Sequence, residues 1–97
     1  MRRVMVRYRV KPDRIAEHEG LIHAVFDELA KTAPAGIRYG AFKLPDGVSF
    51  VHVAFIDAPS NPLDAIAAFK AFTERIKERI EEPAVTADLT AIGTYGL

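Results

Sequence analysis

The stretch Phe50-Val-His-Val-Ala-Phe-Ile56 has apolar side chains on both of the faces that a β-strand would present. Side chains alternate across a strand, so positions 50, 52, 54 and 56 point to one side and positions 51, 53 and 55 to the other. A sheet with one face in water carries polar residues on that face. We therefore expect both sides of this strand to be covered, although a chain of 97 residues has few elements to cover them with.

Length and composition restrict the class of protein. The 97 residues predict one domain over residues 1–97. The 13 Lys and Arg residues balance the 13 Asp and Glu residues, so we expect neither nucleic acid nor an anionic membrane surface as a partner. The chain lacks cysteine, which excludes disulfides, and it lacks an apolar run long enough for a signal or membrane segment. These features predict a soluble, cytoplasmic protein.

A tight turn predicts a hairpin in the middle of the chain. The β-rich residues 37–44 and 48–57 flank Pro45-Asp46-Gly47. Proline presets its φ angle, aspartate can bond its own backbone, and glycine accepts a positive φ. This is the composition of a β-hairpin turn.

Two helical segments and two further strands surround this hairpin. Residues 3–10 alternate as a strand, and Pro12 and Asp13 then start a helix over residues 14–31 with apolar residues at helical spacing. Asn61 is the expected N-cap of a second helix, which begins at Pro62 and ends near Ile80. Residues 85–94 alternate again and predict a closing strand.

The predicted order, βαββαβ, is the ferredoxin-like α+β arrangement. In that topology both helices lie on one face of a four-stranded antiparallel sheet, and the other face has no cover within the chain. Leaving the apolar side chains of residues 50–56 in water on that face would cost several kcal/mol, at about 25 cal/mol per Å². We therefore expect a homodimer that forms by sheet-to-sheet packing.

Two short motifs resemble one family. The start of the chain, Val4-Met-Val-Arg-Tyr-Arg-Val-Lys-Pro-Asp13, resembles the opening strand and helix start of the dimeric α/β-barrel superfamily, in its antibiotic-biosynthesis-monooxygenase-like branch. Ala35-Gly36-Ile37-Arg38-Tyr39, followed by a hairpin, a helix and a closing strand, continues the same order over the whole chain. In this family two protomers pack sheet to sheet into a closed barrel.

The resemblance also implies a range of activities. Members include cofactor-independent oxygenases of aromatic polyketides or quinols, haem-degrading enzymes and small proteins without known activity. The oxygenase and haem-degrading members tend to use Asn and Trp, sometimes with Tyr, Arg or His. This chain has no tryptophan, and Ala54 and Ile56 stand where many members carry Glu and Trp. Its only asparagine is Asn61, the expected helix cap, and we expect no tightly bound cofactor.

Histidines are the first candidate functional residues. His52 interrupts the apolar strand, where it could be a general base on a pocket wall or a bonded core histidine. His18 follows the apolar stripe of the first helix and could line a cavity or lie half-solvated at the edge of the stripe, whereas His23 is expected at the surface. His18 and His23 lack the i, i+4 spacing of a helical metal pair, so no metal site is expected.

Arginines and tyrosines supply the other candidates. Arg38 and Tyr39 could anchor a carboxylate and an aromatic hydroxyl, although both are also ordinary strand residues. Arg7 and Arg9 share a face of the first strand, and Asp88 and Thr90 share a face of the last. Since these strands are neighbours in the predicted topology, the two polar faces could form a structural ion pair or bind an anion.

Three hypotheses of function follow from these observations. The first is an oxygenase- or isomerase-like enzyme that acts on a small aromatic molecule, with His52 as proton acceptor, Arg38 and Tyr39 as anchors and His18 as a wall residue. The second is a non-catalytic protein that binds a small molecule in the same pocket. The third is a structural interaction module without a pocket. The missing tryptophan favours the second and third hypotheses over the first.

Overall fold

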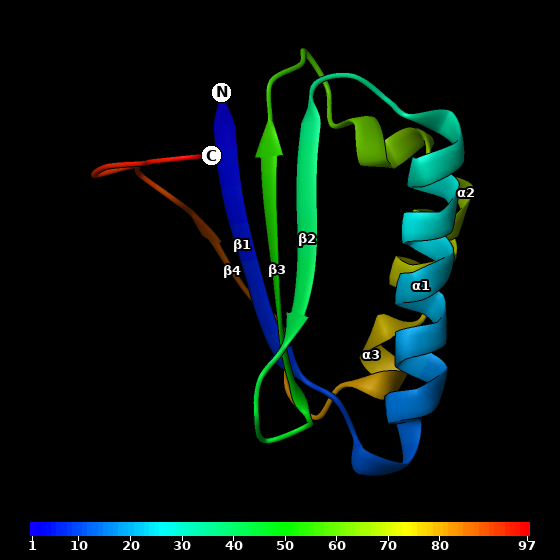
Figure 1. Cartoon of the computed structure of the whole chain (residues 1–97). Helices are drawn as coiled ribbons and strands as arrows, with labels where there is room; N and C mark the ends of the chain where they lie inside the picture. Colours follow the sequence, from blue (N-terminus) through cyan, green and yellow to red (C-terminus); the bar gives the residue numbers. More distant parts are fainter.

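The chain folds into one antiparallel sheet with all of its helices on one side (Figure 1). A computed structural model describes residues 1–97. The strands follow the order β2-β3-β1-β4, which confirms the predicted ferredoxin-like α+β fold. In chain order the elements are β1 (Arg2–Arg9), the 3₁₀ turn η1 (Pro12–Arg14), α1 (Ile15–Thr32), β2 (Ile37–Lys43), β3 (Ser49–Ile56), the 3₁₀ turn η2 (Pro62–Ala65), α2 (Ala67–Glu74), α3 (Ile76–Arg79) and β4 (Val85–Asp88).

The predicted hairpin joins β2 to β3. The Asp46 carboxylate accepts hydrogen bonds from the backbone N–H of Val48 at 3.0 Å and of Ser49 at 2.9 Å, and from the Ser49 hydroxyl at 2.6 Å. Gly47 takes a φ of 78°, the positive value that a glycine turn position favours. The structure therefore confirms the β-hairpin turn that Pro45-Asp46-Gly47 predicted.

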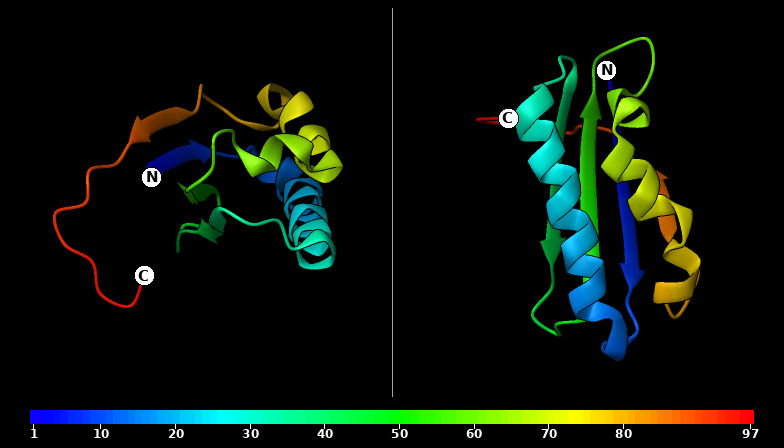
Figure 2. Two further views of the ribbon diagram at one scale, coloured as in Figure 1. Left: turned by 90° about the horizontal axis from the view of Figure 1, so that it is seen from above. Right: turned by 90° about the vertical axis from the view of Figure 1, so that its right-hand side faces the viewer.

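Strand β3 lies inside the sheet, between β2 and β1. Its residues Phe50, His52 and Ile56 face the helices and are buried, and Phe50 belongs to the main apolar core with Tyr8, Val10, Ile22, Val25, Phe72 and Ile80. The opposite side of the sheet, which we call the open face, has no helix over it (Figure 2). It carries the half-buried Val51, Val53 and Phe55 of β3.

The second helix is broken into three pieces, where the sequence predicted one helix up to Ile80. Asn61 caps the first turn as predicted, since its side chain accepts the N–H of Leu63 at 3.0 Å. Ile66 is extended and separates η2 from α2, and a second break at Arg75 separates α2 from α3. The Glu28 carboxylate of α1 accepts the free N–H groups of Ala67 and Ala68 at 3.0 and 2.9 Å. A contact from α1 thus stabilises a helix start that local sequence does not reveal.

The closing strand is shorter than predicted, because β4 ends at Asp88 and not at residue 94. In the register of β4 with β1, Val4 faces Asp88, so position 90 faces Arg2 and residues 91–94 have no β1 residue opposite them. The segment after β4 leaves the sheet and curves round to the open face, as the left view in Figure 2 shows. Tyr95 within it is fully exposed.

The same register corrects the predicted meeting of polar faces between the first and last strands. Residues that face each other in an antiparallel pair lie on the same side of the sheet. Asp88 faces Val4 on the helix side, whereas Arg7 faces Val85 on the open face, and Arg9 lies two residues further along that face. Asp88 pairs instead with Arg2, at 3.5 Å and in an exposed position.

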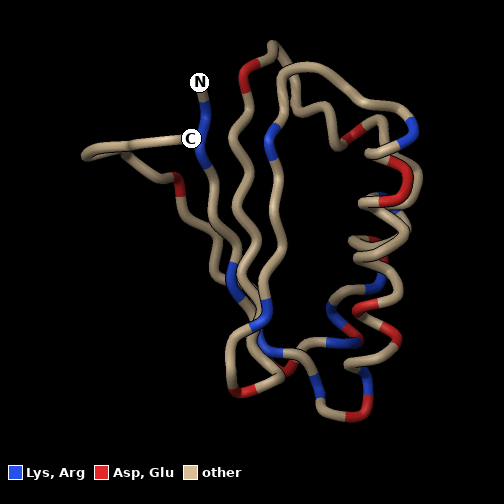
Figure 3. The backbone as a smooth tube through the Cα atoms, viewed as in Figure 1, with Lys and Arg blue, Asp and Glu red and all other residues tan.

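Charged residues of both signs are interspersed along helices and loops, and none falls within β3 (Figure 3). None of the helices combines the length and the apolar content that crossing a membrane requires.

Candidate functional site

The pleat of the sheet decides which of the predicted site residues can meet. His52 faces Val6 of β1 on one side and Ala41 of β2 on the other, and Tyr39 faces Ala54. His52 and Tyr39 therefore both point to the helix side, since facing residues share a side and alternate residues do too. Arg38 is next to Tyr39 in β2 and so points to the open face.

Five side chains form a continuous chain of hydrogen bonds under the helices. The two nitrogens of His52 bond two tyrosine hydroxyls: Nε2 lies 2.6 Å from that of Tyr8 and Nδ1 lies 2.5 Å from that of Tyr39. The Tyr8 hydroxyl also lies 2.6 Å from Nε2 of His18. Arg79 closes the far end by donating from Nε to Nδ1 of His18 at 3.0 Å. We call these five residues the polar chain.

Burial keeps both imidazoles of the polar chain neutral. His18 is 0% exposed and His52 is 5% exposed. Burial lowers the pKa of His52 to about 4. Burial, followed by the charge of Arg79, lowers the pKa of His18 to about 4 as well. Burial also raises the pKa of Tyr8 and Tyr39 far above that of an exposed phenol, so all four rings are uncharged at neutral pH.

Arg79 is a buried cation without a carboxylate partner. Its side chain is 1% exposed and takes part in none of the ion pairs of the chain. Besides His18, it donates from Nη2 to the carbonyl of Phe72 at 2.5 Å, and its guanidinium lies 5.4 Å from the centre of the Phe72 ring. Burial lowers the pKa of Arg79.

The sequence prediction missed Arg79 and Tyr8. A weak signal exists for each of them. Arg79 follows Phe72 by seven residues, close to two helical turns, and Tyr8 shares its side of β1 with Val4 and Val6. Neither position indicates a function unless the residues that face it are known. Only the fold shows which residues those are.

A cavity of about 200 Å³ lies between the sheet and the segment from η2 to α3, with one end of the polar chain in its wall. Tyr8, Tyr39 and His52 are the polar chain residues that line it. The rest of the lining is mainly apolar and consists of Val4, Val6, Ala54, Ile56, Leu63, Phe69, Phe72 and Ile76, together with Arg2, Asn61 and Thr73. We call it the helix-side cavity.

The predicted site residues thus fall into two groups. His52 and Tyr39 line the helix-side cavity and bond each other. His18 is fully buried rather than half-solvated, and it lies behind Tyr8 without lining the cavity. His23 is exposed, as expected. Arg38 is exposed on the open face and is not brought together with the other three.

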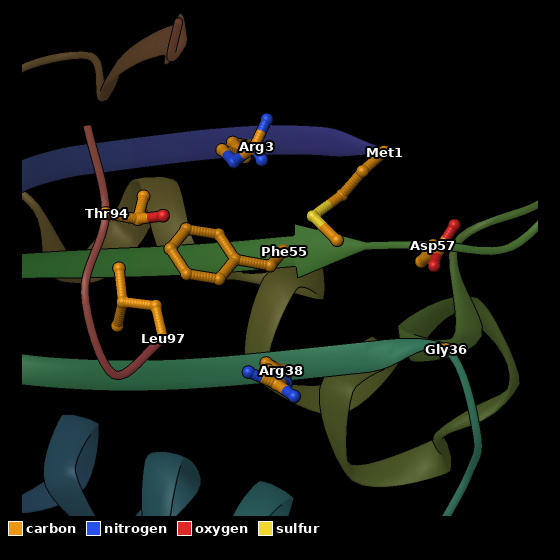
Figure 4. A pocket seen from close by; sticks show the side chains of 8 residues that line it. All are labelled: Met1, Arg3, Gly36, Arg38, Phe55, Asp57, Thr94 and Leu97. Carbon is orange, nitrogen blue, oxygen red and sulfur yellow. The ribbon is translucent and has the colours of Figure 1, made fainter. Parts of the chain in front are cut away.

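Arg38 instead lines a second pocket, of about 280 Å³, on the open face. Figure 4 shows Arg3 and Arg38 on either side of Phe55, with Thr94 and Leu97 from the end of the chain beside them. This pocket and the helix-side cavity lie on opposite sides of the sheet and share no lining residue.

The structure contains no group of three or more His, Cys, Asp or Glu side chains that could hold a metal ion. The titratable groups that line the helix-side cavity are Arg2, which pairs with Asp88, and the His52 imidazole with the phenols of Tyr8 and Tyr39, which already bond one another. The imidazole and the phenols can exchange hydrogen bonds with an oxygen atom of a ligand, and they can hold that ligand next to the apolar part of the lining.

No protein-family model matches the chain, and no curated protein matches its sequence. Solved structures do match. SnoaB, a cofactor-independent oxygenase from Streptomyces nogalater, has a TM-score of 0.70 at 17% identity, over 99% of this chain and 97% of that one.

Two further structures show the same likeness. An antibiotic biosynthesis monooxygenase has a TM-score of 0.71 at 17% identity, over 96% of this chain and 100% of that one. NE2512, a protein of unknown function from Nitrosomonas europaea, has a TM-score of 0.73 at 12% identity, over 97% of this chain and 91% of that one. This chain therefore has the fold of the antibiotic-biosynthesis-monooxygenase-like proteins, as its opening motifs predicted.

Proposed function

We propose that this protein is a monooxygenase-like enzyme that acts, without a tightly bound cofactor, on a small aromatic molecule in the helix-side cavity. The observation that carries the proposal is the composition of that cavity, whose apolar wall ends at the bonded pair Tyr39 and His52. Apolar pockets with a few placed polar groups are the usual form of small-molecule sites. The likeness in fold to a cofactor-independent oxygenase supports the same reaction type.

The size of the cavity sets the size of the substrate. A cavity of about 150 Å³ is enough to hold benzene. The helix-side cavity, at about 200 Å³, is suited to a molecule with one or two rings. Phe69 and Phe72 line it and offer aromatic surfaces on which a ring can pack.

A quinol satisfies the chemical balance without an external reductant. One molecule of hydroquinone and one of O₂ give one hydroxyquinone and one water. One oxygen atom enters the ring and the other leaves as water, and all four electrons come from the substrate. The ring oxygen must first lose its proton to solvent, and the first electron then passes from the resulting anion to O₂.

Tyr39 and His52 form the anchor for that oxygen in the proposal. Hydrogen bonds to a developing oxygen anion are a large source of catalysis in a site that excludes water. Both nitrogens of His52 are already occupied by tyrosine hydroxyls. The proposal therefore has His52 act on the substrate through Tyr39, in place of the direct proton acceptor that the sequence indicated. Arg38 takes no part, since it lies on the open face.

Oxygen uptake with hydroquinone and 1,4-naphthohydroquinone tests the proposal, with ¹⁸O₂ used to follow the atom that enters the product. We expect uptake above the spontaneous rate, and a loss of at least about tenfold in both His52→Ala and Tyr39→Phe. His23→Ala is the matched control, because His23 is exposed on α1 and takes part in none of the hydrogen bonds of the polar chain. Absence of uptake, or uptake that survives His52→Ala, contradicts the enzyme proposal.

The occupation of both His52 nitrogens favours a second candidate, a non-catalytic protein that binds the same molecules. A ligand that binds the folded protein raises the melting temperature, and the stabilisation grows with the logarithm of its concentration relative to Kd. A rise with one- and two-ring phenols, combined with no oxygen uptake, selects this second candidate.

We also propose that two copies of the chain pack open face to open face. Phe42 is 60% exposed and Val85 is 52% exposed on that face, beside the half-buried Val51, Val53 and Phe55. Phe42 lies beside Val51, while the exposed Arg7 lies between Val51 and Val85. An exposed apolar surface rimmed by polar residues is typical of an interface. A second copy has the same surface, so a two-fold arrangement covers both at once.

A further inference from the structure

We propose that the hydrogen bonds of the polar chain run in one direction, from Arg79 to Tyr39, so that the Tyr39 hydroxyl donates its hydrogen into the helix-side cavity and selects a ligand with an anionic oxygen. The inference rests on the proposed function, since it names the ligand class for the same cavity. That class is a phenolate or an enolate attached to one or two apolar rings.

The direction is set at the Arg79 end. A guanidinium can only donate hydrogen bonds, and Nε of Arg79 lies 3.0 Å from Nδ1 of His18. Nδ1 must therefore be the acceptor nitrogen of a neutral imidazole, and the ring hydrogen of His18 lies on Nε2. That hydrogen points to the Tyr8 hydroxyl, 2.6 Å away.

Tyr8 passes the direction on to His52. Its hydroxyl accepts from His18, so its single hydrogen is available for Nε2 of His52, at 2.6 Å. In the reverse arrangement Tyr8 would accept from both histidines, and its own hydrogen would have no acceptor in a side chain that is 4% exposed. An unsatisfied buried donor is costly, which selects the first arrangement.

His52 then presents its hydrogen to Tyr39. Because Nε2 of His52 accepts from Tyr8, the ring hydrogen lies on Nδ1 and is donated to the Tyr39 hydroxyl at 2.5 Å. The Tyr39 hydrogen has no further partner within the chain, and Tyr39 lines the cavity. The ligand must therefore supply an acceptor, and a ligand that offers only a hydrogen leaves this donor unpaired.

Charge favours an anionic acceptor over a neutral one. Arg79 holds a buried positive charge without a carboxylate in contact. The charges of Glu17 and Glu78 act on it, but Glu17 is already paired with Arg14 at 2.9 Å and Glu78 forms no ion pair with it. Arg2 is the one charged residue that lines the cavity, and it is also a cation, paired at 3.5 Å with Asp88, which does not line the cavity. No carboxylate lines the cavity to repel an anion. Aligned donors that start from a cation strengthen the last hydrogen bond of the chain.

The first test is the tautomer of each histidine in the unmodified protein, read from ¹⁵N–¹H correlations of the imidazole rings at neutral pH. We expect the hydrogen on Nε2 in His18 and on Nδ1 in His52. His52 with its hydrogen on Nε2 overturns the proposal. This measurement needs no variant, so it does not depend on whether an Arg79 variant folds.

The second test uses 4-nitrophenol, whose phenol and phenolate forms differ in colour, and 4-nitroanisole, which has the same shape but cannot ionise. We expect the protein to bind 4-nitrophenol as the phenolate and to shift its ionisation toward the anion. Tyr39→Phe should weaken phenolate binding at least about tenfold, and it should leave 4-nitroanisole binding within about twofold. Equal losses for the two probes overturn the donor role of Tyr39.

The two proposals fail in different ways. Phenolate binding with the expected tautomers, but without oxygen uptake from quinols, overturns the oxygenase activity and supports the ligand class. Oxygen uptake combined with the Nε2 tautomer of His52 supports the enzyme and overturns the donor direction. Arg79→Met adds a positioning test, because loss of its hydrogen bond should change the ¹⁵N signature of His18 while Tyr39 remains in place.

Discussion

Tyr8 is the residue on which the polar chain depends, because its hydroxyl is the only group that joins the two buried histidines. Every buried polar side-chain atom in this structure has a hydrogen-bond partner. A satisfied network of this kind stabilises one arrangement of the core, whereas the loss of one member leaves its neighbours unpaired in a medium of low dielectric constant.

We expect Tyr8→Phe to lower the free energy of unfolding by about 2–4 kcal/mol, since it removes two hydrogen bonds and leaves nitrogens of both His18 and His52 without a partner. Urea denaturation at pH 7 measures this change. Tyr95→Phe removes the same atom from a fully exposed side chain and should have no effect. A loss below about 0.5 kcal/mol in Tyr8→Phe would contradict the account of the network.

Stability should fall with pH below the ordinary histidine range. The pKa of both His18 and His52 is about 4 in the folded protein, below the unfolded value of about 6.5, so the unfolded chain binds more protons between these values. Their contribution is complete above pH 6.5 and is lost as the pH falls toward 4, with a slope of at most about 1.4 kcal/mol per pH unit for each imidazole.

Urea denaturation at pH 7, 6 and 5 measures this slope. Each buried imidazole contributes to the dependence of the free energy of unfolding on pH. The free energy of unfolding of His52→Gln should therefore decline less than that of the unmodified protein between pH 7 and pH 5. A free energy of unfolding that does not change between pH 7 and pH 5 would contradict the neutral, buried state of the two rings.

At the scale of single residues, the sequence predicted those features that depend on the pattern of a single strand. The alternation of residues 50–56 was enough to place His52 among apolar neighbours. Tyr39 was predicted as a site residue from the strand that contains it. The same reasoning grouped Arg38 with them, although adjacent strand residues point to opposite faces. The hydrogen bond between His18 and Arg79 joins residues 61 positions apart on two different helices, so local sequence could not predict it.

At the scale of elements, the start of β2 depends on a close approach that only glycine permits. Gly36 takes a φ of 80°, and a Cβ atom there would lie 2.8 Å from the carbonyl oxygen of Asp57 at the end of β3. The carbonyl of Gly36 also accepts the N–H of Asp57 at 2.8 Å. The β2–β3 pairing therefore ends where the two backbones touch. These are the two strands that carry Tyr39 and His52.

Two glycine-to-alanine substitutions should change stability in opposite directions. Gly36→Ala combines a positive φ with a backbone clash, so we expect a loss of more than about 1 kcal/mol. Gly20→Ala lies inside α1, where nothing is within 4 Å of the added Cβ, and it should stabilise by about 0.5–1 kcal/mol. Chemical denaturation of both variants measures the pair, and a stabilised Gly36→Ala would contradict the structure.

The breaks in the second helix and the early end of β4 could not be predicted from the sequence, because each depends on a contact with a distant part of the chain. The Glu28 carboxylate of α1 accepts hydrogen bonds at the start of α2. The register of β4 with β1 leaves residues 91–94 without a partner. The hairpin was predictable because its turn residues satisfy one another locally, as Asp46 does with Ser49. Local chemistry therefore predicted the order of elements but not their ends.

At the scale of the whole molecule, the helices cover only one side of the apolar strand β3. Helices cover Phe50, His52 and Ile56, while Val51, Val53 and Phe55 lie on the open face. The helix-side cavity and the open face lie on opposite sides of the same sheet. Ligand binding and self-association can therefore be tested separately, because a change on one face leaves the side chains of the other in place.

Val53→Glu tests the association, because Val53 lies in the middle of the open face between Met5 of β1 and Gly40 of β2. We expect the unmodified chain to sediment as a dimer at micromolar concentration and Val53→Glu to sediment as a monomer of 10.7 kDa, since the dimer would bury one carboxylate from each copy. Ala24→Glu places the same charge on an exposed position of α1 and should remain dimeric. An unmodified chain that sediments as a monomer would show that the half-buried valines and Phe55 tolerate water, and it would leave the helix-side cavity as the site of function in a single copy.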